Sequence, residues 1–456
     1  MKKIVIGIVC LLLVGVATYW YFHRDNDKAR DVLPEDAAAV AVFEPAEFAE
    51  RCGLTLDDIK SVASVFGGLE EAIDLRKPVY AFTTESGMTG FSLNILDADK
   101  LVNSVSSFGF DSEEQDGLKW IVKRNDGIAC LDADKMLVCN VPSSADTDAV
   151  RSEMVKLMKQ SRQDVKALAD VNKQDGLLRF SAPLKLLDAV SPSINSSADL
   201  KGLQDAVLNT AFQVEDKALK LTARLDTPEK LQLPLAPIKG NLAGIGPAEP
   251  FIWLCVNMNG EQLLPYLRDV PELRTALLAL NMNVDADMMI KAINGDVSLS
   301  IPKLDLEHPD FIFTATLTNT DFLANADDWD GISKRGDADF FIDQAGVFFG
   351  VQAGKLYISS SQRLADNAFM EAPKDAFQSA AKGKYLSASI NVGQLIKSYP
   401  GIALLLRTVP QIRELTDAIE RVSLTADTQQ SLELSLETKK PVKDLISNLW
   451  TLLSDE

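Results

Sequence analysis

The sequence predicts an α+β protein with two tandem, duplicated domains, each an antiparallel sheet with helices on one face, preceded by a single N-terminal transmembrane helix. Landmarks recur in the same order in both halves of the chain. Strand-like runs such as residues 219–225 and 432–437 alternate apolar and polar residues, which indicates antiparallel sheets with one wet face. Pro and Gly gather in residues 228–250, which indicates a linker between the domains.

An octet with the pattern L-R-x-V-P-x-(L/I)-R is the clearest repeat, at residues 267–274 and 406–413. Each copy follows a strand-like run with Asn and Gly at its end, residues 251–260 and 385–393. The Leu and Val spacing is typical of a buried helix stripe, and Pro fits the first turn of the next helix. The octet arginines are candidates for partner contacts, or they pair with neighbouring carboxylates and helix ends: Arg268, Arg274, Arg407 and Arg413.

The first half begins with an apolar strand candidate at residues 37–43, after which Pro45 opens a short helix. Periodicity predicts further strands at residues 79–84, 91–96, 118–122, 128–131, 136–141, 177–182, 211–214 and 219–225. Helical spacing predicts helices at residues 54–75, 101–105, 147–168, 184–187 and 200–208. Turn residues make 118–141 a three-strand meander.

The second half repeats this plan. Residues 313–325 align with residues 91–103, and a second meander is expected at residues 340–342, 347–351 and 356–360. The predicted domains are therefore residues 32–227 and 251–438, joined by the linker at 228–250. Residues 439–456 hold an amphipathic helix that we expect to dock on the body, with the membrane surface as the alternative.

The N-terminal segment, residues 1–31, predicts a membrane anchor followed by a charged stem. Lys2 and Lys3 precede Ile4–Phe22, an uncharged run that spans about 28 Å as a helix. Aromatic residues close the run, as at a membrane interface. The predicted location is the bacterial cell envelope, with the body outside the cytoplasm. The alternative is a signal peptide cleaved near Ala17, which would release the protein into the periplasm.

The charge balance argues against nucleic acid as a partner. The 456 residues carry 46 Lys and Arg against 65 Asp and Glu, a net charge of -19. Such a body repels phosphate backbones and keeps the protein soluble.

Cys130 and Cys139 are the only cysteines with a plausible partnership. A tight hairpin centred on Asp134 and Lys135 would place them on opposite strands, so a disulfide is possible outside the cytoplasm. Two buried thiols on neighbouring strands are the alternative. No cysteine pair has zinc-ligand spacing.

The sequence contains no motif for catalysis, for a cofactor or for a metal. Phosphate-binding loops, nucleotide-binding glycine patterns and nucleophile elbows are absent, and the only histidines are His23 and His308. The acidic run 325–331 has the style of a calcium loop, but Ala326 stands at its first ligand position, which favours a solvated loop.

The segment Leu33–Val42, just after an export segment, resembles an uncharacterised family of Bacteroidetes envelope proteins catalogued only as a domain of unknown function. The resemblance extends to the duplicated plan over residues 32–440 and implies no activity, cofactor or catalytic residue. Many members of that family are similar to lipoproteins. This chain departs from them because Val9 is bulky where lipidation of Cys10 needs a small residue.

Three functions are compatible with these patterns. The first is a non-enzymatic binding or scaffolding module, which an exposed apolar patch would favour. The second is a carrier or sensor of an apolar ligand such as lipid, in a cleft lined by Phe340, Phe341, Phe348 and Phe349. The third is a hydrolase that uses carboxylates, which converging carboxylates with a raised pKa would favour.

Overall fold

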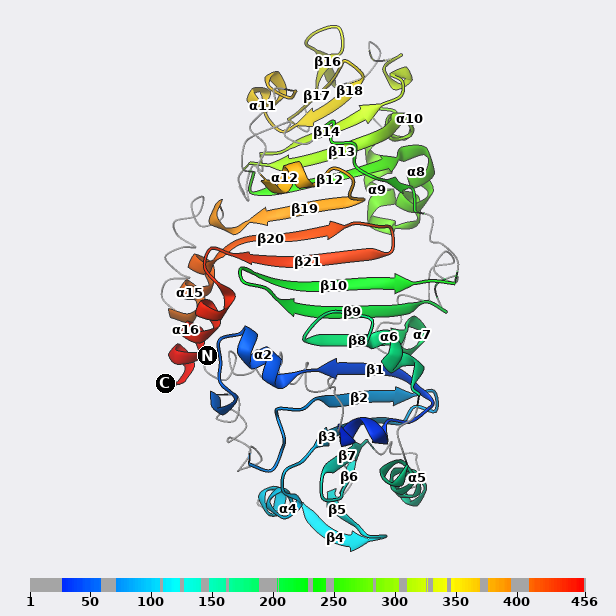
Figure 1. Cartoon of the computed structure of the whole chain (residues 1–456). Coiled ribbons are helices and arrows are strands. Elements are labelled where there is room, and N and C mark those ends of the chain that lie inside the picture. Colours follow the sequence, from blue (N-terminus) through cyan, green and yellow to red (C-terminus); the bar gives the residue numbers. More distant parts are fainter. Residues whose placement is uncertain are drawn as a thin grey trace. The chain divides into compact units, whose positions relative to one another are not determined.

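The computed structural model divides into two compact units, Met1–Glu229 with Pro441–Glu456 (unit 1) and Lys230–Lys440 (unit 2). It combines helices with antiparallel sheets, so the fold is α+β (Figure 1). The residues that the structure describes are 27–58, 71–106, 110–123, 127–140, 147–160, 164–187, 203, 205–228, 233–242, 250–281, 284–302, 310–324, 326, 331–342, 346–369, 376–394 and 410–454.

The sheet of unit 1 has the strand order β4-β5-β6-β7-β3-β2-β1-β8-β9-β10, with every neighbouring pair antiparallel. β1 lies in its interior and is apolar along its whole length because both of its faces are covered. The strands are β1 (Ala37–Phe43), β2 (Val79–Thr84), β3 (Thr89–Asn94), β4 (Asp111–Gln115), β5 (Leu118–Lys123), β6 (Gly127–Leu131), β7 (Lys135–Cys139), β8 (Leu178–Pro183), β9 (Val207–Val214) and β10 (Ala218–Asp226).

Helices cover both faces of this sheet. Trp120 of β5 belongs to the buried cluster that also holds side chains of α5 (Thr147–Lys159) and α6 (Lys166–Val171), whereas its neighbour Ile121 belongs to a second cluster with α4 (Ala98–Ser106). Successive side chains of a strand point to opposite faces, so α4 lies across the sheet from α5 and α6. The prediction of helices on one face is therefore wrong for unit 1, because β5 to β7 are apolar on both faces.

The two ends of the chain both contribute to unit 1. η1 (Lys28–Val32) buries Ala29 and Val32, so part of the predicted stem belongs to the core. α16 (Val442–Ser454) docks through Val442 and Leu445, as its apolar stripe predicts, beside α2 (Pro45–Arg51). The remaining helix of this unit among the described residues is the short α7 (Leu184–Leu187).

The sheet of unit 2 has the order β15-β16-β17-β18-β14-β13-β12-β19-β20-β21, again antiparallel, and β11 pairs with the end of β12. This order matches that of unit 1 strand for strand. The strands are β11 (Leu235–Ala236), β12 (Ile252–Asn259), β13 (Ile293–Ile301), β14 (Ile312–Leu317), β15 (Ile332–Lys334), β16 (Asp339–Ile342), β17 (Val347–Gln352), β18 (Lys355–Ser359), β19 (Leu386–Asn391), β20 (Ile419–Ala426) and β21 (Ser431–Thr438).

The helices of unit 2 begin where capping residues and Pro predict. The Asn259 side chain accepts from the Gln262 amide at 3.1 Å and caps α8, and Pro271 opens α9. The described helices are α8 (Gly260–Asp269), α9 (Pro271–Leu280), α10 (Ala286–Ala292), η6 (Asp321–Leu323), α11 (Gln362–Asp366), α12 (Ala376–Ala380) and α15 (Pro410–Ala418).

Three expectations from the sequence are wrong at the level of single segments. Residues 233–242 are not a free linker, because β11 pairs with β12 and both Ile238 and Leu242 are buried. The helix expected at 147–168 is divided, since α5 ends at Lys159 and α6 begins at Lys166. Residues 207 and 208, expected to end the helix at 200–208, begin β9 instead.

The predicted anchor Ile4–Phe22 lies outside the described residues. Among the helices that the structure does describe, none combines the length and the apolar character needed to span a bilayer.

Candidate functional site

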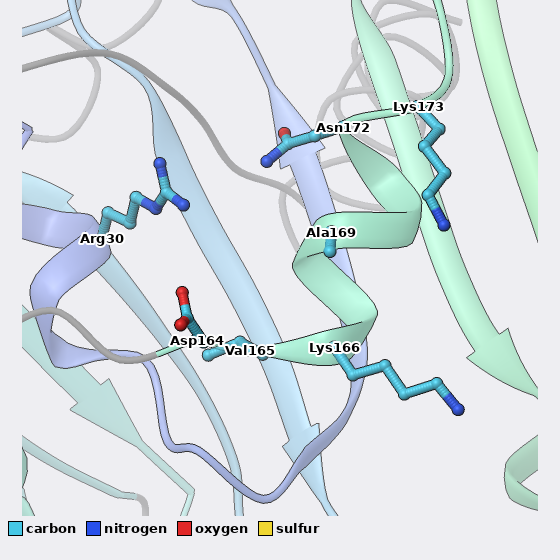
Figure 2. A pocket seen from close by; sticks show the side chains of 7 residues that line it. All are labelled: Arg30, Asp164, Val165, Lys166, Ala169, Asn172 and Lys173. Carbon is cyan, nitrogen blue, oxygen red and sulfur yellow. The ribbon is translucent and has the colours of Figure 1, made fainter.

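A pocket of about 480 Å³ opens in unit 1 between η1 and α6 (Figure 2). Three of its seven lining residues carry basic side chains, and the lining residues are Arg30, Asp164, Val165, Lys166, Ala169, Asn172 and Lys173. These three basic residues contrast with the net charge of -19 of the whole chain. Its volume lies within the range of small-molecule sites.

A buried polar network holds η1 in place beside the pocket. Asp27 accepts hydrogen bonds from the Tyr80 hydroxyl at 2.7 Å and from the Asn94 amide at 2.6 Å. The side-chain Oδ1 of Asn94 in turn accepts from the backbone amides of Lys28 and Ala29, at 3.1 and 3.3 Å. These bonds tie the first turn of η1 to β2 and β3, and so they fix the position of Arg30.

Arg30 and Asn172 bring buried polar atoms to the pocket. The Arg30 Nε and the Asn172 Oδ1 are inaccessible to solvent and have no hydrogen-bond partner. In Figure 2 the guanidinium of Arg30, the amide of Asn172 and the carboxylate of Asp164 face the same space, while Lys166 and Lys173 point away from it. Lys173 pairs instead with Asp170 at 2.7 Å.

The polar groups of the pocket suit a ligand that carries an anionic oxygen. A guanidinium binds a carboxylate through two parallel N–H groups, and an amide N–H₂ adds a third donor. Asp164 adds an acceptor at the pocket mouth. Sequence reasoning missed this pocket, because Arg30 looked like part of a charged stem and Asn172 lies in a segment without a motif.

A second candidate is the helical surface of α8, α9 and α10, called here the α8–α10 surface. These three helices pack against one another in unit 2 (Figure 1). Leu278 is 64% exposed and Leu273 is 44% exposed. The exposed large apolar side chains on this surface are Tyr266, Val270, Leu273, Leu278 and Met288.

The octet therefore does not bury all of its apolar residues. Leu264 and Leu277 face the interior, but Val270 and Leu273 of the octet are exposed, so the expected buried stripe is wrong for these two positions. Exposed apolar side chains on neighbouring helices are typical of surfaces that bind another molecule.

The structure places two of the four octet arginines. The guanidinium of Arg268 forms an ion pair with the carboxylate of Asp287 at the base of α10. Arg274 is exposed on α9. Arg407 lies outside the described residues, and for Arg413 only the backbone, within α15, is described.

Cys130 and Cys139 are free and buried. Cys130 lies opposite Leu137 and Cys139 lies opposite Ile128. The expectation that the two cysteines face each other is wrong, because the turn is centred one residue earlier than predicted and Leu131 pairs with Met136. The register separates the thiols diagonally on one face of the sheet.

The four phenylalanines proposed for an apolar cleft lie on opposite faces of their strands. Phe340 stacks on Phe349 at 5.0 Å in the core beneath α10, and Phe341 contacts Phe348 at 4.6 Å on the other face. The guanidinium of Arg335 covers the Phe348 ring at 4.9 Å. These residues therefore do not line one cleft.

No group of three or more potential metal ligands gathers in the part of the chain that the structure describes.

Burial changes the pKa of the cysteine thiols. It raises the pKa of Cys52, Cys139 and Cys255 to about 12, from an ordinary value of 9.0. Thiolates are the reactive form, so these cysteines are inert in the folded protein.

This shift predicts a loss of stability at alkaline pH. A thiol that ionises near pH 9 in the unfolded chain and near 12 in the folded protein stabilises the fold fully below pH 9. That contribution declines as the pH rises from about 9 to about 12, by up to ~1.4 kcal/mol per pH unit for each thiol. Urea unfolding at pH 7 and pH 10 measures it, with a Cys52→Ala, Cys139→Ala, Cys255→Ala variant as the control. Rapid labelling of the three thiols in the folded protein at neutral pH would contradict the prediction.

Comparison with known proteins identifies the family. Residues 59–443 match the family described as Domain of unknown function (DUF4836). The chain belongs to this family. The match covers most of the chain, including parts of both units, and the family description names no activity.

No curated protein matches the chain. Among solved structures it is similar to crystal form IV of TP0453, with 13% identity, a TM-score of 0.31, and coverage of 44% of this chain and 81% of that one. Crystal form I of TP0453 gives 12% identity and a TM-score of 0.30, with coverage of 46% and 82%. At these scores the likeness carries no argument about function.

Proposed function

We propose that this DUF4836 protein is a non-enzymatic binding module of the bacterial cell envelope, held at the membrane by Ile4–Phe22 with its body outside the cytoplasm. The exposed apolar side chains of the α8–α10 surface carry this proposal. Burying such side chains against a partner contributes roughly 25 cal/mol for each Å² of apolar surface removed from water.

A duplicated domain underlies the proposed module. The matching strand orders of unit 1 and unit 2 support duplication, as do the repeated octet and the aligned segments of the sequence. Duplication doubles a scaffold without adding chemistry, which suits a binding role. The envelope location and the Bacteroidetes origin rest on the N-terminal segment and on the resemblance of Leu33–Val42.

The proposed partner is a protein with an apolar surface edged by carboxylates. Arg268 and Arg274 are exposed and stand within two residues of the exposed Val270 and Leu273 in the sequence, so the proposed apolar centre has cationic residues near it. Arg is enriched at protein interfaces because its planar guanidinium binds carboxylates through two hydrogen bonds. The ion pair between Arg268 and Asp287 shows that a carboxylate can pair with an arginine on this surface.

Replacing Leu273 and Leu278 together by Ser is expected to weaken partner binding by at least tenfold. Each lost apolar contact near the centre of an interface costs about 1 kcal/mol or more. The full chain is first crosslinked in its native envelope and then solubilised in mild detergent. The captured partner is purified and titrated against the natural protein and against the double variant.

Leu96→Ser is the matched control, since Leu96 is an exposed leucine of unit 1 at 51% exposure. It should bind the partner as the natural protein does. Equal partner binding by the double variant would overturn the proposal. Self-association or binding to phosphatidylglycerol vesicles that the double variant alone abolishes would overturn the choice of a protein partner.

A further inference from the structure

We infer that the pocket between η1 and α6 binds a small zwitterion, namely a carboxylate that carries an amino group nearby, as in a free amino acid. The pocket lies in unit 1 and is independent of the α8–α10 surface. Its polar residues supply complementary groups for both ends of such a ligand.

The anionic end of the ligand is assigned to Arg30. Its Nε is buried and has no acceptor, although a buried N–H without a partner costs about 1–3 kcal/mol. Such a group in a native protein calls for an explanation, and a bound ligand oxygen provides one. A carboxylate that approaches the guanidinium side-on would accept from Nε and from one terminal N–H₂.

Asn172 lies across the pocket from Arg30 and faces the same space (Figure 2). Its Oδ1 is buried without a donor. Arg30 Nε thus lacks an acceptor while Asn172 Oδ1 lacks a donor, and the two residues line one pocket. Because both atoms are inaccessible in this conformation, each side chain turns toward the pocket when a ligand with both an acceptor and a donor group meets the two needs.

The cationic end of the ligand is assigned to Asp164. Its carboxylate is exposed at the mouth of the pocket, on the same side as Arg30. An ammonium group there pairs with Asp164 while the carboxylate remains on Arg30. Val165 and Ala169 line the rest of the pocket and leave room for a short aliphatic side chain.

The rigidity of η1 supports a preformed site. The bonds of Asn94 to the amides of Lys28 and Ala29 hold the turn that carries Arg30. The buried Ser92 hydroxyl adds a hydrogen bond to the Ala29 carbonyl at 2.8 Å. A side chain presented by a fixed turn loses less entropy when a ligand binds.

The test titrates the full chain in mild detergent with L-alanine, propionate and inorganic phosphate, followed by saturation-transfer NMR and calorimetry. L-Alanine is expected to bind at least tenfold more tightly than propionate or phosphate, because only L-alanine engages both Arg30 and Asp164. Arg30→Gln should weaken L-alanine binding at least tenfold. Asp164→Asn should weaken L-alanine binding while leaving propionate binding unchanged.

Arg51→Gln serves as the control, since Arg51 is an exposed arginine of unit 1 that pairs with Glu47 on α2. Circular dichroism and urea unfolding verify that each variant is folded. Binding of phosphate or propionate as tight as that of L-alanine would overturn the zwitterion. Full L-alanine binding by Arg30→Gln, or none by the natural protein up to about 10 mM, would overturn the site.

Discussion

Replacing Asp296 by Ala is expected to lower the free energy of unfolding of unit 2 by about 3–5 kcal/mol. Asp296 is fully buried on β13. Its carboxylate accepts from the backbone amides of Lys239 and Asn241, both at 2.8 Å, and from the Asn257 amide at 3.0 Å. Ala would remove this acceptor from the part-buried backbone amides of Lys239 and Asn241 and from one N–H of the buried Asn257 amide, and each loss costs about 1–3 kcal/mol.

Urea unfolding monitored by Trp fluorescence measures this loss. Hydrogen exchange should show that the amides of Lys239 and Asn241 lose protection first, because Asp296 alone accepts their hydrogen bonds. Asp427→Ala is the control, since Asp427 forms an exposed ion pair with Lys384 and such pairs contribute little. Equal unfolding midpoints for the Asp296 and Asp427 variants would refute the claim that the Asp296 carboxylate stabilises unit 2 by binding the segment before β12.

Replacing Gly260 by Ala is expected to destabilise unit 2 by about 2–4 kcal/mol and to displace α8 from α10. A Cβ at position 260 would lie 1.9 Å from the Ile290 carbonyl oxygen and 3.1 Å from that of Ile293. Both contacts are backbone atoms, so no side chain can turn aside. Ala favours helices by about 1 kcal/mol over Gly, so a net loss of stability isolates the steric effect.

Gly336→Ala provides the comparison, because the nearest atom to a Cβ there lies at 3.5 Å, an ordinary contact. Differential scanning calorimetry of both variants measures the change in melting temperature. The Gly260 variant should also bind the partner of the α8–α10 surface less well, since that surface depends on the packing of α8 on α10. A Gly260 variant as stable as the Gly336 variant would show that α8 shifts freely.

Local pattern predicted much of the fold because burial and periodicity act on neighbouring residues. The run at residues 37–43 and the strand at 79–84 match β1 and β2 to the residue. Pro271 and Pro410 begin α9 and α15, since Pro suits the first turn of a helix. The expected membership in a family of unknown function is confirmed.

Other elements carry no local signal. All five side chains of β4 are exposed, and its sequence contains no apolar residue that could alternate with the polar ones. Only the pairing with β5 therefore makes it a strand. Whether Cys130 faces Cys139 depends on which residues form the centre of the turn between β6 and β7. A shift of the turn by one residue pairs each cysteine with a different residue. α4 lies opposite α5 because both faces of β5 are apolar, a fact that periodicity alone did not assign to particular helices.

The sequence by itself determined the α+β class, the antiparallel strands and the order of the repeated landmarks, because each depends on residues close together in the chain. Only the tertiary structure decided which side chains meet. Arg30 and Asn172 are distant in sequence and line one pocket because η1 and α6 pack on the same face of the sheet. The octet's Val270 and Leu273 are exposed because Leu264 and Leu277 occupy the interior positions of α8 and α9. Such choices follow from packing between elements, which no local pattern encodes.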